Sequence, residues 1–162
     1  MHNSVVYTIH HCFSGAGVTT LRFNFSGVGN SEGRYAEGLG EQEDLLSAHR
    51  FLTDKGYETI DLAGYSFGAW VGAALACRTD LFRHVYLISP PVNFMDFSDI
   101  SEVLSLRQVI VGDRDDFADL STVRSVLNRL KQDARLDILP DTDHFYSSRL
   151  TQLSEAISAN LE

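Results

Sequence analysis

Two kinds of hydrophobic spacing alternate along the chain. Stretches in which apolar residues recur every three or four positions are typical of amphipathic helices, whereas short runs of β-branched and aromatic residues are typical of strands. The longer stretches predict helices over residues 5–16, 41–55, 67–77, 120–132 and 147–161. The short runs predict strands over residues 19–25, 59–63, 84–88, 108–111 and 136–139.

This alternation indicates an α/β fold. Strands that are separated by crossover helices pair in parallel, and the helices cover both faces of the sheet. We therefore predict a three-layer sandwich with about five parallel strands. The 162 residues suffice for one such domain, which we assign to residues 1–162 because no repeat, linker or low-complexity tract divides the chain.

The charge balance narrows the range of partners. Acidic residues outnumber basic ones by 22 to 13, which gives a net charge of −9. Nucleic acids and anionic membranes attract basic surfaces, so we expect neither as a partner. No apolar run approaches the roughly 20 residues of a membrane span, and the N-terminus lacks a signal-peptide pattern. Cys12 and Cys77 lie in separate helical stretches, as is typical of reduced core thiols, so we predict a cytoplasmic protein.

The strongest chemical signal is the segment Gly64-Tyr65-Ser66-Phe67-Gly68, between a predicted strand and a helix rich in small residues. A Gly-x-Ser-x-Gly turn in this context presents its serine as a nucleophile, and the flanking glycines are expected to avoid steric clashes. The partial positive charge of the helix N-terminus and the backbone N–H of Phe67 would both face a developing oxyanion. We interpret the segment as the nucleophile elbow of a serine hydrolase, with Ser66 as the nucleophile.

A serine hydroxyl needs a base to remove its proton and an acid to orient that base. Both are expected on loops that follow later strands. His144 is the histidine at such a strand-to-helix loop. The strand at 108–111 is followed by three aspartates, Asp113, Asp115 and Asp116. Their positions in the sequence do not decide which of them is the acid that orients His144. Asp143 is interpreted as a cap for the segment after it.

Further apolar and aromatic residues are candidates for substrate contact. Tyr65 lies beside the nucleophile, and Pro91 and Phe94 follow the strand at 84–88. Met95 and Phe97, in the same stretch, fit either an acyl pocket or simple packing against the domain.

The glycine turn at residues 27–33 offers a competing interpretation as a dinucleotide-binding loop. Its third glycine is one residue late, and an acidic loop follows it in place of a helix. We interpret it as a turn at the rim of the active site, and we expect no cofactor and no metal.

Together these motifs resemble a family of small bacterial α/β-hydrolases, the dienelactone-hydrolase-like serine hydrolases. The similarity is carried by residues 21–33, 62–69, 89–92 and 143–145, although Ser26 stands where the family commonly has arginine. The Gly-x-x-Asp pattern of the family, laid on residues 112–115, selects Asp115 as the acid. The resemblance implies a triad of Ser66, Asp115 and His144 that cleaves small carboxylic esters or thioesters.

The resemblance also implies that the chain lacks the N-terminal strands of the family. One of them lies between the strands that correspond to 19–25 and 59–63, and the loop after it supplies a second oxyanion donor. We expect the two flanking strands to pair directly, and we consider His2 and Asn3 as substitute donors. Exposed strand edges would favour a homo-oligomer. A weak or inactive remnant with a binding or oligomerisation role, and a flavodoxin-like module that uses the glycine turn, remain as alternatives.

Overall fold

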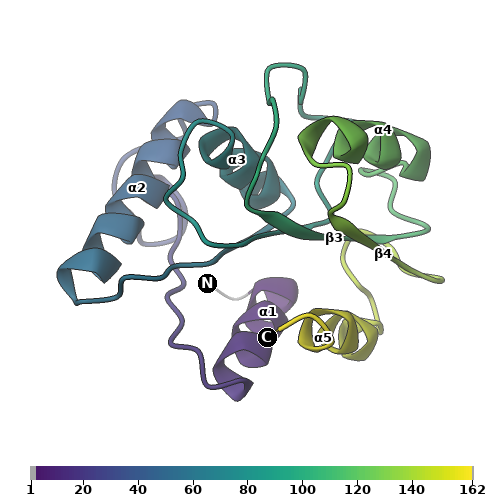
Figure 1. Cartoon of the computed structure of the whole chain (residues 1–162), viewed down its shortest axis with the longest axis horizontal. Coiled ribbons are helices and arrows are strands. Elements are labelled where there is room, and N and C mark those ends of the chain that lie inside the picture. The colour runs from purple at the N-terminus through teal and green to yellow at the C-terminus, as the bar shows by residue number, and fades with distance from the viewer. Residues whose placement is uncertain (1–2, 162) are drawn as a thin grey trace.

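A computed structural model describes residues 3–161 of the chain (Figure 1). Its helices are α1 (Ser4–Gly15), α2 (Leu39–Asp54), α3 (Phe67–Ala76), α4 (Leu120–Leu130) and α5 (Leu150–Ser158). Its strands are β1 (Leu62–Tyr65), β2 (Val85–Ile88), β3 (Leu106–Gly112) and β4 (Arg135–Leu139). All five predicted helices form, with ends shifted by a few residues.

The four strands form one parallel sheet in the order β1-β2-β3-β4, so each strand lies beside the preceding one in the chain. All four residues of β2 are buried, as is most of β3, because helices cover both sides of the sheet. This burial explains why these strands appear in the sequence as continuous apolar runs without polar alternation.

The helices divide between the two faces of the sheet. Figure 1 shows α2, α3 and α4 on one side and α1 and α5 on the other. Neighbouring residues of one strand enter opposite cores: Leu87 packs with α3 and α4, whereas Ile88 packs with α1 and α5. Within the described part of the chain, no helix has the length and apolar character needed to cross a membrane. The architecture is the three-layer α/β sandwich that the sequence predicts.

The predicted strand at residues 19–25 is wrong. Within residues 3–161 the segment is extended but pairs with no strand, so the sheet has four strands there and the expected direct pairing with the next strand is absent. The segment instead contacts helices on both faces of the sheet: Thr20 is hydrogen-bonded to His10 of α1, and Phe25 makes an edge-on contact with Phe67 of α3. A groove separates the segment from β1.

Candidate active site

The elbow at the end of β1 has the strained geometry that its sequence predicts. Ser66 has φ 53° and ψ −121°, an unfavourable backbone conformation for a residue with a side chain, and its N–H donates to the Ile88 carbonyl at 2.9 Å. A Cβ atom at Gly64 would lie 2.4 Å from the carbonyl oxygen of Gly68, so only glycine fits there. A Cβ at Gly68 would meet open space. The expectation that both glycines avoid a clash therefore applies to Gly64 alone.

Ser66, His144 and Asp115 form a continuous chain of hydrogen bonds. Nε2 of His144 lies 2.8 Å from Oγ of Ser66, and Nδ1 lies 2.9 Å and 3.0 Å from the two carboxylate oxygens of Asp115. The three residues follow β1, β4 and β3, whose carboxyl ends meet at one edge of the sheet. Both His144 and Asp115 are 5% exposed, so water competes little for these bonds. With its proton on Nδ1, the imidazole can accept the Ser66 proton on Nε2.

The other nearby carboxylates have different partners. Asp113 is exposed and accepts the N–H of Thr142 at 3.3 Å, and Asp116 is exposed. Asp143 accepts the N–H of Ser147 at 2.9 Å, and this backbone bond holds the pKa of Asp143 below its usual value. Of the candidate acids, Asp115 is the one that the structure places against the imidazole.

Aromatic rings surround the imidazole of His144. Phe117 stacks on it at 4.4 Å between centroids, and Tyr65 and Phe145 each lie 5.4 Å away. The hydroxyl of Tyr65 donates to the His144 carbonyl at 3.0 Å, and burial is the main reason that the pKa of Tyr65 rises to about 12. Phe117 was not identified from the sequence. The available signal was its position two residues after Asp115, whose carboxylate accepts the Phe117 N–H at 2.9 Å.

Of the apolar residues that follow β2, only some lie near His144. Phe94 is 66% exposed, and its ring centroid lies 4.7 Å from that of Phe117, which stacks on the imidazole of His144. Pro91 is buried, and its carbonyl accepts the N–H groups of Phe94 and Met95. Phe97 belongs to the core between the sheet and α4. Simple packing therefore accounts for Phe97, and Phe94 remains the residue of this segment that a substrate could touch.

One backbone donor is in place for an oxyanion. Phe67 is the first residue of α3, and its N–H has no hydrogen-bond acceptor among the described residues. The side-chain oxygen of Asn3 caps α1 by accepting the N–H groups of Val5 and Val6, and a role of its amide nitrogen as a second donor stays a prediction. His2 lies outside the described residues.

The glycine turn at residues 27–33 closes on itself. The N–H of Gly27 donates to the Glu32 carbonyl at 3.0 Å, and a Cβ there would lie 2.9 Å from Cα of Arg34. Ser26 donates from its backbone and its hydroxyl to Asp44 of α2. The glycine thus serves a tight turn anchored to α2. Nowhere in residues 3–161 do three or more His, Cys, Asp or Glu side chains gather to hold a metal ion.

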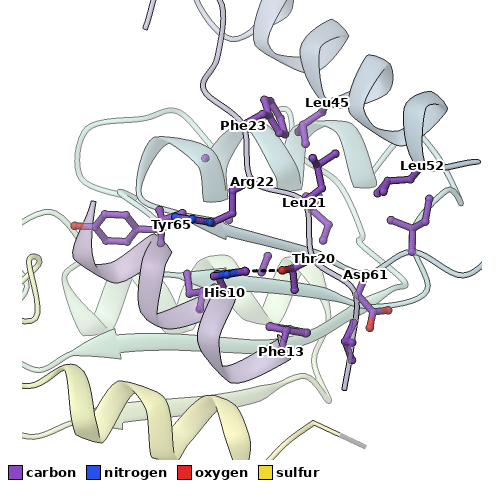
Figure 2. Close-up of a pocket in the computed structure, with 18 of the residues that line it drawn as sticks. His10, Phe13, Thr20, Leu21, Arg22, Phe23, Leu45, Leu52, Asp61 and Tyr65 are labelled. Atoms are coloured by element: carbon purple, nitrogen blue, oxygen red, sulfur yellow. Dashed lines mark hydrogen bonds between the residues drawn. The ribbon is translucent and has the colours of Figure 1, made fainter. Parts of the chain in front are cut away.

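A groove of about 440 Å³ runs from the elbow along the outer edge of β1 (Figure 2). On its far side lies the unpaired segment 18–25, which includes Arg22. Its apolar walls come from α1, α2 and β1 and include Ile9, Phe13, Leu45, Leu52 and Leu62. A guanidinium nitrogen of Arg22, Nη1, is buried without a hydrogen-bond partner in the described part of the chain.

The backbone of β1 is satisfied on one side only. The N–H of Leu62 donates to the carbonyl of His84, next to β2, and successive residues of a strand direct their backbone groups to opposite edges. The N–H and carbonyl of Ala63 therefore face the groove, where no partner lies among residues 3–161.

Comparisons with known proteins agree with this fold, although no protein-family model matches the chain. A structure of an α/β serine hydrolase homologue from Coxiella burnetii superposes with a TM-score of 0.92 and 32% identity, over 100% of this chain and 78% of that one. A lidless α/β serine hydrolase from Xanthomonas campestris gives a TM-score of 0.90 and 35% identity, over 99% of this chain and 73% of that one. An uncharacterized protein of Rickettsia prowazekii is 33% identical over 168 residues, which cover 98% of this chain and 71% of that protein. The chain belongs to the family of small α/β serine hydrolases.

Proposed function

We propose that the protein hydrolyses small carboxylic esters or thioesters through an acyl-enzyme on Ser66. The observation that carries this proposal is the unbroken path from the Ser66 hydroxyl through His144 to Asp115, with distances of 2.8 Å and 2.9 Å. A hydroxyl bonded to a buried, carboxylate-paired imidazole is the arrangement that activates serine in acyl transfer.

The reaction would proceed in two halves. Ser66 Oγ bonds to the substrate carbonyl carbon while its proton passes to Nε2 of His144, and Asp115 stabilises the resulting imidazolium. The tetrahedral oxyanion faces the free N–H of Phe67 at the start of α3. The bond to the leaving alkoxide or thiolate then breaks, and that group takes the proton from His144. Water repeats the sequence on the acyl-enzyme, which releases the acid and restores Ser66.

The oxyanion site determines how fast this chemistry can be. Loss of one oxyanion donor typically lowers turnover by about 10²–10³-fold. Phe67 is the single backbone donor that we assign. We therefore expect slow turnover of p-nitrophenyl acetate, together with clear covalent reaction of Ser66 with activated electrophiles that rely less on oxyanion stabilisation.

A fluorophosphonate probe tests the assignment directly. The wild type should be labelled at one residue, which peptide mass spectrometry should identify as Ser66, and Ser66→Ala should not be labelled. Ser121→Ala, on the exposed N-terminal turn of α4, is the matched control and should label like the wild type. Equal labelling of wild type and Ser66→Ala would refute the proposal.

The open groove favours a second candidate function, the association of copies through the unpaired edge of β1. Backbone groups at this edge, such as those of Ala63, can pair with a strand from another chain, and the buried Nη1 of Arg22 offers a donor to an incoming carbonyl or carboxylate. Light scattering should then find a dimer. Ala63→Pro removes the N–H that faces the groove and should give a monomer. A wild type that stays monomeric at all concentrations would rule this function out.

The charge of the protein bears on its location in the cell and on its partners. We propose a cytoplasmic enzyme whose partners are small molecules, with neither nucleic acid nor membrane among them. The net charge of −9 supports this, since both of those partners select basic surfaces.

A further inference from the structure

Tyr65, the residue before the nucleophile, contacts the catalytic base. Its hydroxyl donates to the carbonyl oxygen of His144 at 3.0 Å, although the two residues are 79 positions apart in the chain. Its ring lies 5.4 Å from the imidazole, at an interplanar angle of 32°. One side chain therefore connects the elbow to the loop that carries the base.

The loop between β4 and α5 needs such a restraint, because its backbone is strained. Asp141, Tyr146 and Ser148 have φ values of 51°, 56° and 60°, in the left-handed region that side chains disfavour. Such conformations are unfavourable for residues that carry a side chain and persist only where surrounding contacts impose them. Without those contacts the loop would relax, and the imidazole would move with it.

Most contacts that hold this loop do not reach His144. Asp143 accepts the Ser147 N–H, and the hydroxyl of Tyr146 pairs with Ser89 at 2.9 Å. Among the described residues, the Tyr65 hydroxyl is the one group that hydrogen-bonds to the backbone of His144. The position of the imidazole relative to Ser66 thus depends on Tyr65 more directly than on the rest of the loop.

The imidazole is also aligned by its ring neighbours. The Phe117 ring stacks on it at an interplanar angle of 30°, and the Tyr65 ring is tilted by 32° to it. Contacts with these two rings restrict rotation about the side-chain bonds of His144. It leaves Nδ1 directed at Asp115 and Nε2 directed at Ser66.

We propose that Tyr65 is a positioning residue: its hydroxyl fixes the His144 backbone so that Nε2 stays in line with Ser66 Oγ. The proposal rests on the serine hydrolase function proposed above. The hydroxyl is suited to the task because burial raises the pKa of Tyr65 to about 12, which keeps it a donor across the pH range in which a serine hydrolase works.

Tyr65→Phe tests this role, because it keeps the ring and removes only the donor. The second-order rate constant for fluorophosphonate labelling should fall about tenfold, as expected when one hydrogen bond no longer holds a reacting group in place. Proton NMR supplies a readout that does not depend on turnover. The far-downfield resonance of the His144 Nδ1–H bonded to Asp115 should broaden in Tyr65→Phe. Incorporation of 3-fluorotyrosine at position 65, which keeps the donor, should restore both signals.

Tyr146→Phe is the matched control. It removes a more deeply buried hydroxyl from the same loop and leaves Ser89 without its partner, but it does not touch His144. It should lower the melting temperature while the labelling rate stays within about twofold of wild type.

Two results would overturn the inference. One is a Tyr65→Phe protein with wild-type labelling and an unchanged downfield resonance. The other is an equal loss of labelling in Tyr65→Phe and Tyr146→Phe, which would assign both effects to loop stability. Failure of the proposed function is distinguishable, because it appears as labelling of Ser66→Ala, whereas the NMR readout reports on His144 alone.

Discussion

The two edges of β1 differ sharply. At one edge, β1 pairs with β2 and so joins the four-stranded sheet. Three strands of this sheet, β1, β3 and β4, are followed by Ser66, Asp115 and His144, which form the hydrogen-bonded chain. Within residues 3–161, the edge that faces the groove has unpaired backbone groups, and the extended segment across the groove pairs with no strand. The hydrogen-bonded chain of Ser66, His144 and Asp115 is therefore carried by the residues that follow β1, β4 and β3, and it is complete without any group in the groove.

Burial follows the same division. Leu87 on β2 is 1% exposed, whereas Leu21 and Phe23 in the unpaired segment are 41% and 37% exposed. The hydrogen-bonded chain of Ser66, His144 and Asp115 thus lies on the well-buried side of β1, and substitutions on the two sides should have separable effects.

The largest expected effect lies on the paired side. Asp115→Asn should lower the fluorophosphonate labelling rate by about 10³–10⁴-fold, because an amide at this position favours the wrong imidazole tautomer. Asp113→Asn and Asp116→Asn alter the same loop at exposed positions and should stay within about twofold of wild type. A larger loss in either control than in Asp115→Asn would move the acid to another residue.

The two glycines of the elbow should respond differently to alanine. Gly64→Ala places a Cβ 2.4 Å from the carbonyl oxygen of Gly68 and should lower the free energy of unfolding by about 3 kcal/mol or more. Gly68→Ala faces open space in the groove and should change it by less than about 1 kcal/mol. Urea denaturation measures both. Equal costs would mean that the groove at Gly68 is closed in solution.

Leucine-to-alanine substitutions on the two sides of β1 should give smaller differences in the free energy of unfolding. Leu87→Ala empties a fully packed site and should cost about 2–3 kcal/mol in the free energy of unfolding. Leu21→Ala removes a half-exposed side chain and should cost less than about 1 kcal/mol. If Leu21→Ala proves as costly as Leu87→Ala, the segment 18–25 is packed against a partner that completes the groove.

The smallest effect is an alkaline destabilisation from Tyr65, at the boundary between the two sides. Its pKa rises from 10.0 to about 12, so the folded protein favours the neutral phenol. This contribution to stability is complete below pH 10 and is lost as the pH rises towards 12. The free energy of unfolding of wild type should therefore fall more over this range than that of Tyr65→Phe. Identical slopes would show that the hydroxyl is free to ionise.

Hydrophobic spacing in the sequence predicted the five helices and the strands of the sheet. The order of these elements in turn predicted that Ser66 and His144 lie at the same edge of the sheet. Choosing Asp115 over its neighbours required the shape of its loop. Gly112 packs so tightly on Thr142 that a Cβ would lie 2.0 Å from its carbonyl oxygen, and the resulting turn buries Asp115 while Asp113 and Asp116 face solvent. From the residues alone all three remained open, and only the family pattern selected one.

The segment 19–25 shows why strand pairing could not be predicted from the sequence. Its residues have strand propensity, and the backbone is indeed extended, but a strand exists only where a partner lies at pairing distance. That distance depends on helices packed elsewhere in the chain. The contacts of Tyr65 and Phe117 with His144 were missed for the same reason, because they join residues that no local pattern relates.

The sequential order of the sheet also sets the order of events during synthesis. Ser66 and His144 are 78 positions apart, and β4 is the last strand to be added. At translation rates of roughly 5–20 residues per second, the base follows the nucleophile by about 4–16 s. Until then the Ser66 hydroxyl lacks the imidazole that would activate it. The proposed reactivity of Ser66 would thus appear only after the sheet is complete, and a covalent probe would label only completely folded molecules.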